Sequence, residues 1–186
     1  MRPSSVLVLF FAISLCLSGC ATTRYNAYFD QTPNGPYTLG SGDRLRIIVF
    51  GQDSLSNTYA VDGAGNISMP LIGAVSAAGQ TTIGLQHTLE ARFRAGFLRE
   101  PRISVEVEAF RPFFVLGEVA APGQYPFING MTVETAVAVA GGFTPRAFRG
   151  DADLTRTIDG QQLTGPVPYT QPVHPGDTIV VRERYF

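Results

Sequence analysis

The sequence contains no lysine and no tryptophan, and it has only two histidines and two cysteines in 186 residues. All 14 cationic side chains are therefore arginines, a bias for which the sequence offers no physical reason. With a formal net charge of -1, the chain lacks the excess positive charge that neutralises phosphates, so nucleic-acid binding is not expected. A content of 45% hydrophobic and 16% charged residues predicts an ordinary folded protein of one or two domains.

Residues suited to catalysis are scarce as well. His87 lies inside a predicted helix and His174 precedes a turn, while no G-x-S-x-G motif and no zinc-ligand spacing occurs. A glycosidase typically needs two carboxylates, one with a raised pKa. Glu106 and Glu108 instead alternate onto one face of a strand, which is typical of a solvated sheet face. The glycine-rich stretches "GAGN" and "AGGF" do not follow the strand-to-helix pattern of a phosphate site, so we expect no enzyme and no cofactor.

A long hydrophobic run is also missing. The apolar stretch 6–17 has about a dozen residues, fewer than the roughly 20 that cross a bilayer as a helix, and it follows the basic Arg2. This pattern predicts a cleaved secretory signal over residues 1–19. Its end, "LSGC", resembles a bacterial lipobox, in which the cysteine becomes the first mature residue and carries lipid; the alternative is a plain signal peptide with an incidental cysteine.

Lipid attachment at Cys20 would leave no other thiol in the mature chain, because Cys16 departs with the signal peptide. A disulfide, a thiol metal site and a cysteine nucleophile are then excluded. A lipoprotein cysteine carries more than one acyl chain, which makes anchoring stable. Lipoproteins kept at the inner membrane typically have Asp after the cysteine, so Ala21 favours the outer membrane.

The mature chain is predicted to begin with a tether over residues 20–36, which lacks periodicity and ends in turn-forming residues. A first strand-rich domain is expected over residues 37–109. "DRLRIIVF" favours a strand, and "VDGAGNISMPLIG" favours a hairpin or a tight loop. One amphipathic helix follows, with Leu85, Leu89 and Phe93 on one face, Thr81 or Thr82 as its cap and Gly96 in a left-handed conformation at its end. The strand "RISVEVEAF" closes this domain.

A second strand-rich domain is expected over residues 110–186. "FFVLGEVAAPGQYPF" predicts a strand, a turn at Pro122-Gly123 and a returning strand at 125–127. "TVETAVAVAGG" predicts a short helix that begins after Thr132 and ends at Gly141 and Gly142. A hairpin around Asp159-Gly160 precedes the last strand. The predicted fold class is α+β, with two small domains that each contain one helix. Domains of this size bury a modest core, which makes assembly with other copies plausible.

Two Gly-Asp turns introduce strands at opposite ends of the folded chain. Gly42-Asp43 opens the first domain and Gly176-Asp177 precedes the last strand of the second. An Asp at such a position can accept hydrogen bonds from nearby backbone N–H groups and fix the turn. We interpret both turns as structural rather than catalytic.

Several separately spaced motifs together resemble the bacterial outer-membrane polysaccharide export proteins of the Wza type. "YTLGSGDRLRIIVFG", "VDGAGNISMPLIGAVSAAGQTT" and "PRISVEV" resemble the polysaccharide export domain of that family. "VLGEVAAPGQYPF", "TVETAVAVAGGFTPRA" and "HPGDTIVVRERYF" resemble its soluble-ligand-binding β-grasp (SLBB) domain. The resemblance covers nearly all of the mature chain and implies that the second domain has a β-grasp-like fold.

The resemblance also implies a function and partners. Proteins of this type are periplasmic lipoproteins of the outer membrane that assemble as homo-oligomeric rings and give capsular polysaccharide or exopolysaccharide a route outward. They work with an inner-membrane polysaccharide co-polymerase. No covalent chemistry is needed for such a role, and a translocating glycan requires a wet, weakly adhesive passage.

One departure from the family pattern concerns the membrane crossing. Well-known relatives continue into a C-terminal amphipathic helix and usually carry more than one SLBB repeat, whereas this sequence has one repeat and no later apolar stretch of about 20 residues. Its strands are short and interrupted by prolines, unlike those of a membrane barrel. We therefore expect a short form that depends on a separate outer-membrane channel protein. The alternatives are a lipid-anchored module that binds a glycan or an envelope protein without forming a conduit, and an envelope glycan-modifying enzyme.

Overall fold

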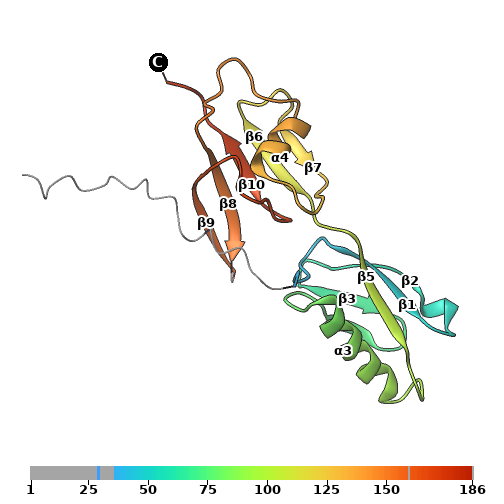
Figure 1. Cartoon of the computed structure of the whole chain (residues 1–186). Helices are drawn as coiled ribbons and strands as arrows, with labels where there is room; N and C mark the ends of the chain where they lie inside the picture. The colour runs from blue at the N-terminus through green and yellow to red at the C-terminus, as the bar shows by residue number, and fades with distance from the viewer. Residues whose placement is uncertain (1–28, 30–35, 159, 186) are drawn as a thin grey trace, which may run out of the picture.

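The structure is a computed structural model that describes Phe29, residues 36–158 and residues 160–185. In these residues the chain forms two α-helices and three small β-sheets, which confirms the predicted α+β class. Figure 1 shows two lobes joined by the segment that follows strand β5. Each lobe has its own cluster of buried hydrophobic side chains, so each is described as a domain.

The first domain combines a three-stranded antiparallel sheet, a separate hairpin and one long helix. The sheet has the order β2-β1-β5, and the hairpin pairs β3 with β4. The elements are β1 (Arg44–Val49), the 3-10 helix η2 (Asp53–Leu55), β2 (Asn57–Ala60), β3 (Asn66–Met69), β4 (Gly73–Ser76), α3 (Thr82–Arg94) and β5 (Ile103–Ala109).

Helix α3 buries the predicted face, consisting of Leu85, Leu89 and Phe93. These side chains recur every four residues and therefore form one stripe that packs into the first core. Thr81 is the N-cap, and its hydroxyl accepts a hydrogen bond of 3.0 Å from the backbone N–H of Gly84. The prediction for the other end of the helix was wrong. Gly96 does not have a positive φ, and the helix ends at Ala95, which is in the right-handed conformation. The N–H groups of Phe97 and Leu98 both reach the carbonyl of Phe93, which satisfies that end without a left-handed residue.

The loop 61–65 forms a tight turn rather than a hairpin between its flanking strands. β2 pairs with β1 and β3 pairs with β4, so the strands on either side of the loop belong to different sheets. The Asp62 carboxylate accepts hydrogen bonds of 2.9 Å from the N–H groups of Ala64 and Asn66, and these bonds close the turn. The loop thus redirects the chain from one sheet to the other.

The second domain is a mixed five-stranded sheet with one helix on it. The strand order is β7-β6-β10-β8-β9; β10 runs parallel to β6, and the other neighbouring pairs are antiparallel. The elements are β6 (Phe113–Gly117), β7 (Gly123–Tyr125), α4 (Val133–Val139), β8 (Ala152–Ile158), β9 (Gln161–Val167) and β10 (Thr178–Val181). The return strand begins at Gly123, two residues earlier than predicted, and it stops before Pro126, which has no N–H to donate to a ladder.

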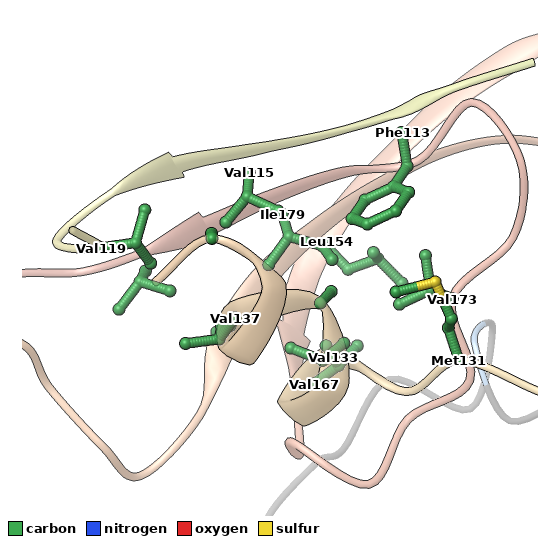
Figure 2. Close-up of a cluster of buried hydrophobic side chains, with 14 of the residues drawn as sticks. Phe113, Val115, Val119, Met131, Val133, Val137, Leu154, Val167, Val173 and Ile179 are labelled. Carbon is green, nitrogen blue, oxygen red and sulfur yellow. The ribbon is translucent and has the colours of Figure 1, made fainter. Parts of the chain in front are cut away.

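Helix α4 packs its apolar stripe against the sheet. Val133, Ala136 and Val137 are buried, and Figure 2 shows Val133 and Val137 facing side chains from the strands, among them Val115, Leu154 and Ile179. The N-cap Thr132 and Thr135 exchange hydrogen bonds in a capping box, so the predicted cap is confirmed. Burial of each large aliphatic side chain contributes roughly 1.5–3 kcal/mol, which makes this cluster the main stabilising element of the domain.

Candidate functional site

The two Gly-Asp turns, which are far apart in the sequence, meet the same arginine at the junction of the domains. Arg111 lies in the short connection between β5 and β6. Its backbone and side chain contact the first turn through Asp43 and the second turn through the carbonyl of Pro175. We name the group Tyr37, Asp43, Arg111, Pro175 and Gly176 the junction cluster.

Asp43 organises the first-domain half of the junction cluster. Its carboxylate is fully buried and accepts hydrogen bonds from the N–H of Arg111 (2.8 Å), the N–H of Gly40 (2.8 Å) and the hydroxyl of Tyr37 (2.6 Å). An Nη1 atom of Arg111 lies 3.4 Å from the same carboxylate. These donors satisfy the hydrogen-bonding capacity of the buried carboxylate without water. Burial, and secondarily the hydrogen bond to Asp43, raise the pKa of Tyr37 well above its usual value, which keeps the phenol protonated as a donor.

The Arg111 side chain ties the second domain to this carboxylate. Its Nη1–H donates to the Tyr37 hydroxyl (2.9 Å), and its Nε–H donates to the carbonyl of Pro175 (3.1 Å). The N–H of Gly176 returns a bond of 3.1 Å to the carbonyl of Pro112. Gly176 has a φ of +87°, and a Cβ at this position would lie 3.0 Å from the Nε of Arg111, so both the turn and the close approach favour glycine.

Aromatic rings cover the polar part of the junction. Phe110 meets Tyr37 edge to face with 4.9 Å between ring centroids, and it meets Phe127 of the second domain in the same way at 5.5 Å. Pairs of this geometry add about 0.5–1.5 kcal/mol each beyond the area they bury. The junction therefore combines charge-assisted hydrogen bonds with an apolar contact, and this combination favours one fixed arrangement of the domains.

The second turn contains a buried ion pair of its own. The Asp177 carboxylate accepts hydrogen bonds from Arg156 of β8, from Nε at 2.9 Å and Nη2 at 2.7 Å, and from the N–H of His174 at 2.7 Å. Arg156 and Asp177 are 5% and 1% exposed, so this bidentate pair is almost free of water. Burial, together with the nearby Arg156 cation, lowers the pKa of His174, and Asp177 opposes this with a smaller effect.

Phe29 is packed into the second domain close to this pair. It lies within the predicted tether, yet it is 2% exposed and belongs to the second hydrophobic cluster. Its carbonyl accepts a hydrogen bond of 2.8 Å from the side-chain amide of the buried Gln171, and the Arg156 guanidinium lies 6.0 Å from its ring centroid. One residue of the predicted tether is therefore packed against the second domain rather than against the first domain, which follows it directly in sequence.

The remaining predicted residues do not form a second site. His87 and the Glu106 carboxylate are exposed, and Glu108 is partnered by Arg44 (3.7 Å) and Thr58 (3.2 Å). Gly141 and Gly142 follow α4 with φ values of +83° each. The proposed lipid site, Cys20, lies outside the described residues. Within residues 36–158 and 160–185 and at Phe29, no cluster of three or more His, Cys, Asp or Glu side chains could hold a metal ion.

The sequence reasoning missed Tyr37, Arg111 and Arg156. A signal existed for Arg156, because it continues the alternation of Ala152 and Leu154 on β8, which places its side chain on the buried face. A buried arginine requires a carboxylate partner, and Asp177 was already known as a turn residue. Arg111 gave no such signal, because its partners depend on how two domains are placed.

The geometry can therefore hold two domains at a fixed angle. Among the described residues, no helix has both the length and the apolar character that crossing a membrane would require. The chemical content of the site is a set of fixed charges and hydrogen bonds that stabilise the arrangement of the domains.

Comparison with known proteins connects this architecture to a family. Residues 31–108 match the family described as polysaccharide biosynthesis/export protein, and residues 112–167 match the SLBB domain. Similar curated proteins include the exopolysaccharide production protein ExoF of Rhizobium meliloti, which is 34% identical over 57% of this chain and 28% of its own length. The EPS I polysaccharide export outer membrane protein EpsA of Ralstonia nicotianae is 27% identical over 80% of this chain and 48% of its own length.

A more distant relative is the polysialic acid transport protein KpsD of Escherichia coli, 25% identical over 60% of this chain and 20% of its own length. The chain thus spans less than half the length of each of these relatives. The two family matches nevertheless lie one in each domain, at residues 31–108 and 112–167. The chain therefore combines a region that matches the polysaccharide biosynthesis/export protein family with a following region that matches the SLBB domain.

Proposed function

We propose that this protein is a periplasmic, outer-membrane-anchored component of a complex that exports capsular polysaccharide or exopolysaccharide, and that copies of it form part of a ring-like conduit. The observation that carries the proposal is the junction cluster, because Arg111 joins the two domains through its ion pair with Asp43 and its hydrogen bond to the carbonyl of Pro175. The wall of a conduit needs subunits of constant shape. Domains that moved freely would open and close gaps between neighbouring copies.

The match to the polysaccharide biosynthesis/export family and the similarity to the export protein EpsA support the prediction that the chain is not an enzyme. The partners follow from the family resemblance rather than from any contact in the structure. They are the polysaccharide itself, an inner-membrane polysaccharide co-polymerase and an outer-membrane channel protein. The curated relative EpsA is described by its name as an outer membrane polysaccharide export protein, which supports the same compartment for this chain.

Lipid attachment at Cys20 would limit how far the domains can move from the membrane. Phe29 follows Cys20 by nine positions and is fixed in the second domain. An extended chain spans at most about 3.3–3.6 Å per residue, so the seat of Phe29 would stay within roughly 30 Å of the lipid headgroups. The junction cluster would remain close to the membrane as well. Arg156 lies against the Phe29 ring and bonds to Asp177, which follows Gly176 of the junction cluster.

The experiment is deletion of the gene in its native bacterium, with polymer measured separately outside the cell and in the periplasm. We expect loss of surface polymer, with either retention inside or arrest of synthesis, and restoration by the wild-type gene. A Cys20→Ser version should restore export poorly and appear in the soluble periplasmic fraction. Normal surface polymer in the deletion strain, with no second copy of the gene present, would contradict the proposal.

Oligomeric state separates a conduit from the alternative of a binding module. The lipidated protein, extracted in mild detergent, should give a large species by size and mass measurement. A protein that remains monomeric under these conditions would favour a lipid-anchored module that binds a glycan or another envelope protein.

A further inference from the structure

The second domain carries an arginine-lined hollow that the proposed function does not use. It has a volume of about 470 Å³, within the range of roughly 300–1,000 Å³ typical of ligand sites. It is lined by the loop between α4 and β8 and by the segment after β10. Figure 1 shows both segments at the end of the second domain that lies away from the first domain. Its lining residues are Pro145, Ala147, Phe148, Arg149, Gly150 and Arg184.

The loop that forms the hollow is held on both sides. The N–H of Phe148 donates to the carbonyl of Arg182, and the N–H of Arg184 donates to the carbonyl of Arg146, both at 2.8 Å. The Tyr169 hydroxyl lies 2.9 Å from the carbonyl oxygen of Phe148 and 3.1 Å from that of Asp151. Burial raises the pKa of Tyr169 to about 12, so its phenol stays protonated and remains a donor. The hollow is therefore formed before any ligand arrives.

The ring of Phe148 is fixed in place while part of its surface stays open. The Arg182 guanidinium lies 5.3 Å from the ring centroid, and Arg182 is itself paired with Asp151 and Asp153. A Cβ on Gly150 would lie 2.5 Å from the ring, so the ring can occupy this place only above a glycine. With 37% of its area exposed, Phe148 offers a flat apolar surface beside the arginines.

Arg149 differs from the neighbouring arginines in its partner. Arg146 pairs with Glu183, whereas Arg149 lies 5.4 Å from the ring centroid of Phe143 and, in the described part of the chain, has no carboxylate partner. Phe143 is supported in turn by an edge-to-face contact of 5.2 Å with Tyr169. The lining also contains the second cation, Arg184, and no acidic side chain. The hollow therefore offers the guanidinium of Arg149, which is held against the ring of Phe143 and has no carboxylate partner among the described residues.

These features match a carboxylate on a sugar ring. A guanidinium presents parallel N–H donors that fit both oxygens of a carboxylate, and it remains charged at every physiological pH. An aromatic ring packs against the C–H face of a pyranose through apolar contact. An open hollow also suits a unit inside a longer chain, whose two ends must leave the site. We propose that the hollow binds a carboxylate-bearing sugar residue, such as a uronate unit, of the polysaccharide.

This inference rests on the proposed function for the presence of the glycan, but its test does not need export. The probe is a galacturonate trisaccharide, and the matched ligand is the same trisaccharide with its carboxylates methyl-esterified. Binding to the purified, lipidated protein in detergent is measured by calorimetry. We expect the acidic form to bind about tenfold more tightly than the ester, and added salt to weaken it.

Two substitutions identify the site. Arg149→Gln should weaken binding of the acidic trisaccharide about tenfold, and Arg149→Lys should recover only part of this, because an ammonium lacks the fork of donors. The control Arg99→Gln removes an exposed arginine of the first domain and should leave binding unchanged. Unchanged thermal unfolding of each variant excludes loss of fold.

Three outcomes would overturn the inference: equal binding of acid and ester, no effect of Arg149→Gln, and no binding at all. Inorganic phosphate that displaced the trisaccharide with equal affinity would assign the hollow to anions in general and overturn the sugar assignment. If binding fails while deletion of the gene still abolishes surface polymer, the export function stands without this site. If binding is found and export is normal in the deletion strain, the sugar-binding site stands and the export function is contradicted.

Discussion

Two buried aspartates at the centre of this protein are each paired with an arginine. Asp43 and Asp177 each follow the glycine of a turn and accept several hydrogen bonds. Arg111 donates to Asp43, and Arg156 donates to Asp177. A buried pair of this kind is weak evidence for high stability, because desolvation offsets much of the attraction between the charges. Removal of one partner is different, since it leaves the other charge buried without compensation.

Asp177→Ala should therefore destabilise the second domain by about 3–5 kcal/mol. It leaves the Arg156 guanidinium, which is 5% exposed, without a carboxylate. The matched control is Glu183→Ala, which breaks the exposed, solvent-screened ion pair with Arg146 and should change stability little. Denaturant unfolding measures both. The double change Arg156→Met with Asp177→Leu should cost less than Asp177→Ala, and a larger cost would contradict the desolvation argument.

His174 should make stability depend on pH. In the folded protein its pKa lies below the ordinary value of 6.5, because burial and Arg156 disfavour the imidazolium. The unfolded chain therefore binds the proton more readily, and stability falls as pH drops through about 6.5. His174→Gln should lose less stability than the wild type between about pH 7.5 and about pH 5.5, measured as the change in denaturant midpoint. Equal losses in the two proteins would show that His174 does not carry this effect.

Elements were predictable where their signal is local. The stripes of α3 and α4, their threonine caps and the hairpin of β8 and β9 follow from spacing within a few residues. Pairing between distant segments was not predictable in this way. β2 pairs with β1 rather than with β3, and β10 pairs with β6 in parallel. These strand pairings are set by the packing of the whole domain. The end of α3 also differed, since two N–H groups that share one carbonyl made a left-handed Gly96 unnecessary.

In the candidate site, too, the features with a local sequence signal were predictable and the contacts between distant segments were not. Asp43 and Asp177 were recognised as turn residues, because an Asp after a glycine at a strand entrance has a local use for its carboxylate. That both turns face Arg111 depends on the placement of two domains, which no spacing within either domain encodes. Phe29 is a similar case, because a single aromatic residue in an otherwise aperiodic segment does not reveal a seat in the second domain.

At the scale of the whole molecule, the central question is whether the two domains behave as one body. The connection between β5 and β6 is short, yet a short connection alone permits rotation about several backbone bonds. Arg111 removes that freedom, because its side chain bonds simultaneously to Tyr37 in the first domain and to Pro175 in the second. Phe110 adds an apolar contact on both sides.

Arg111→Ala should therefore broaden the distribution of distances between the domains without unfolding either of them. Spin labels at the exposed positions Ser54 and Gln162, one in each domain, allow this distribution to be measured by pulsed electron paramagnetic resonance. The wild type and the control Arg99→Ala should give one narrow peak. Asp43 keeps its bonds to the N–H groups of Gly40 and residue 111 and to the Tyr37 hydroxyl, so the first domain should stay folded. A peak as narrow as that of the wild type would mean that the aromatic contact alone fixes the junction, and Phe110→Ala in the same background would then be required to release it.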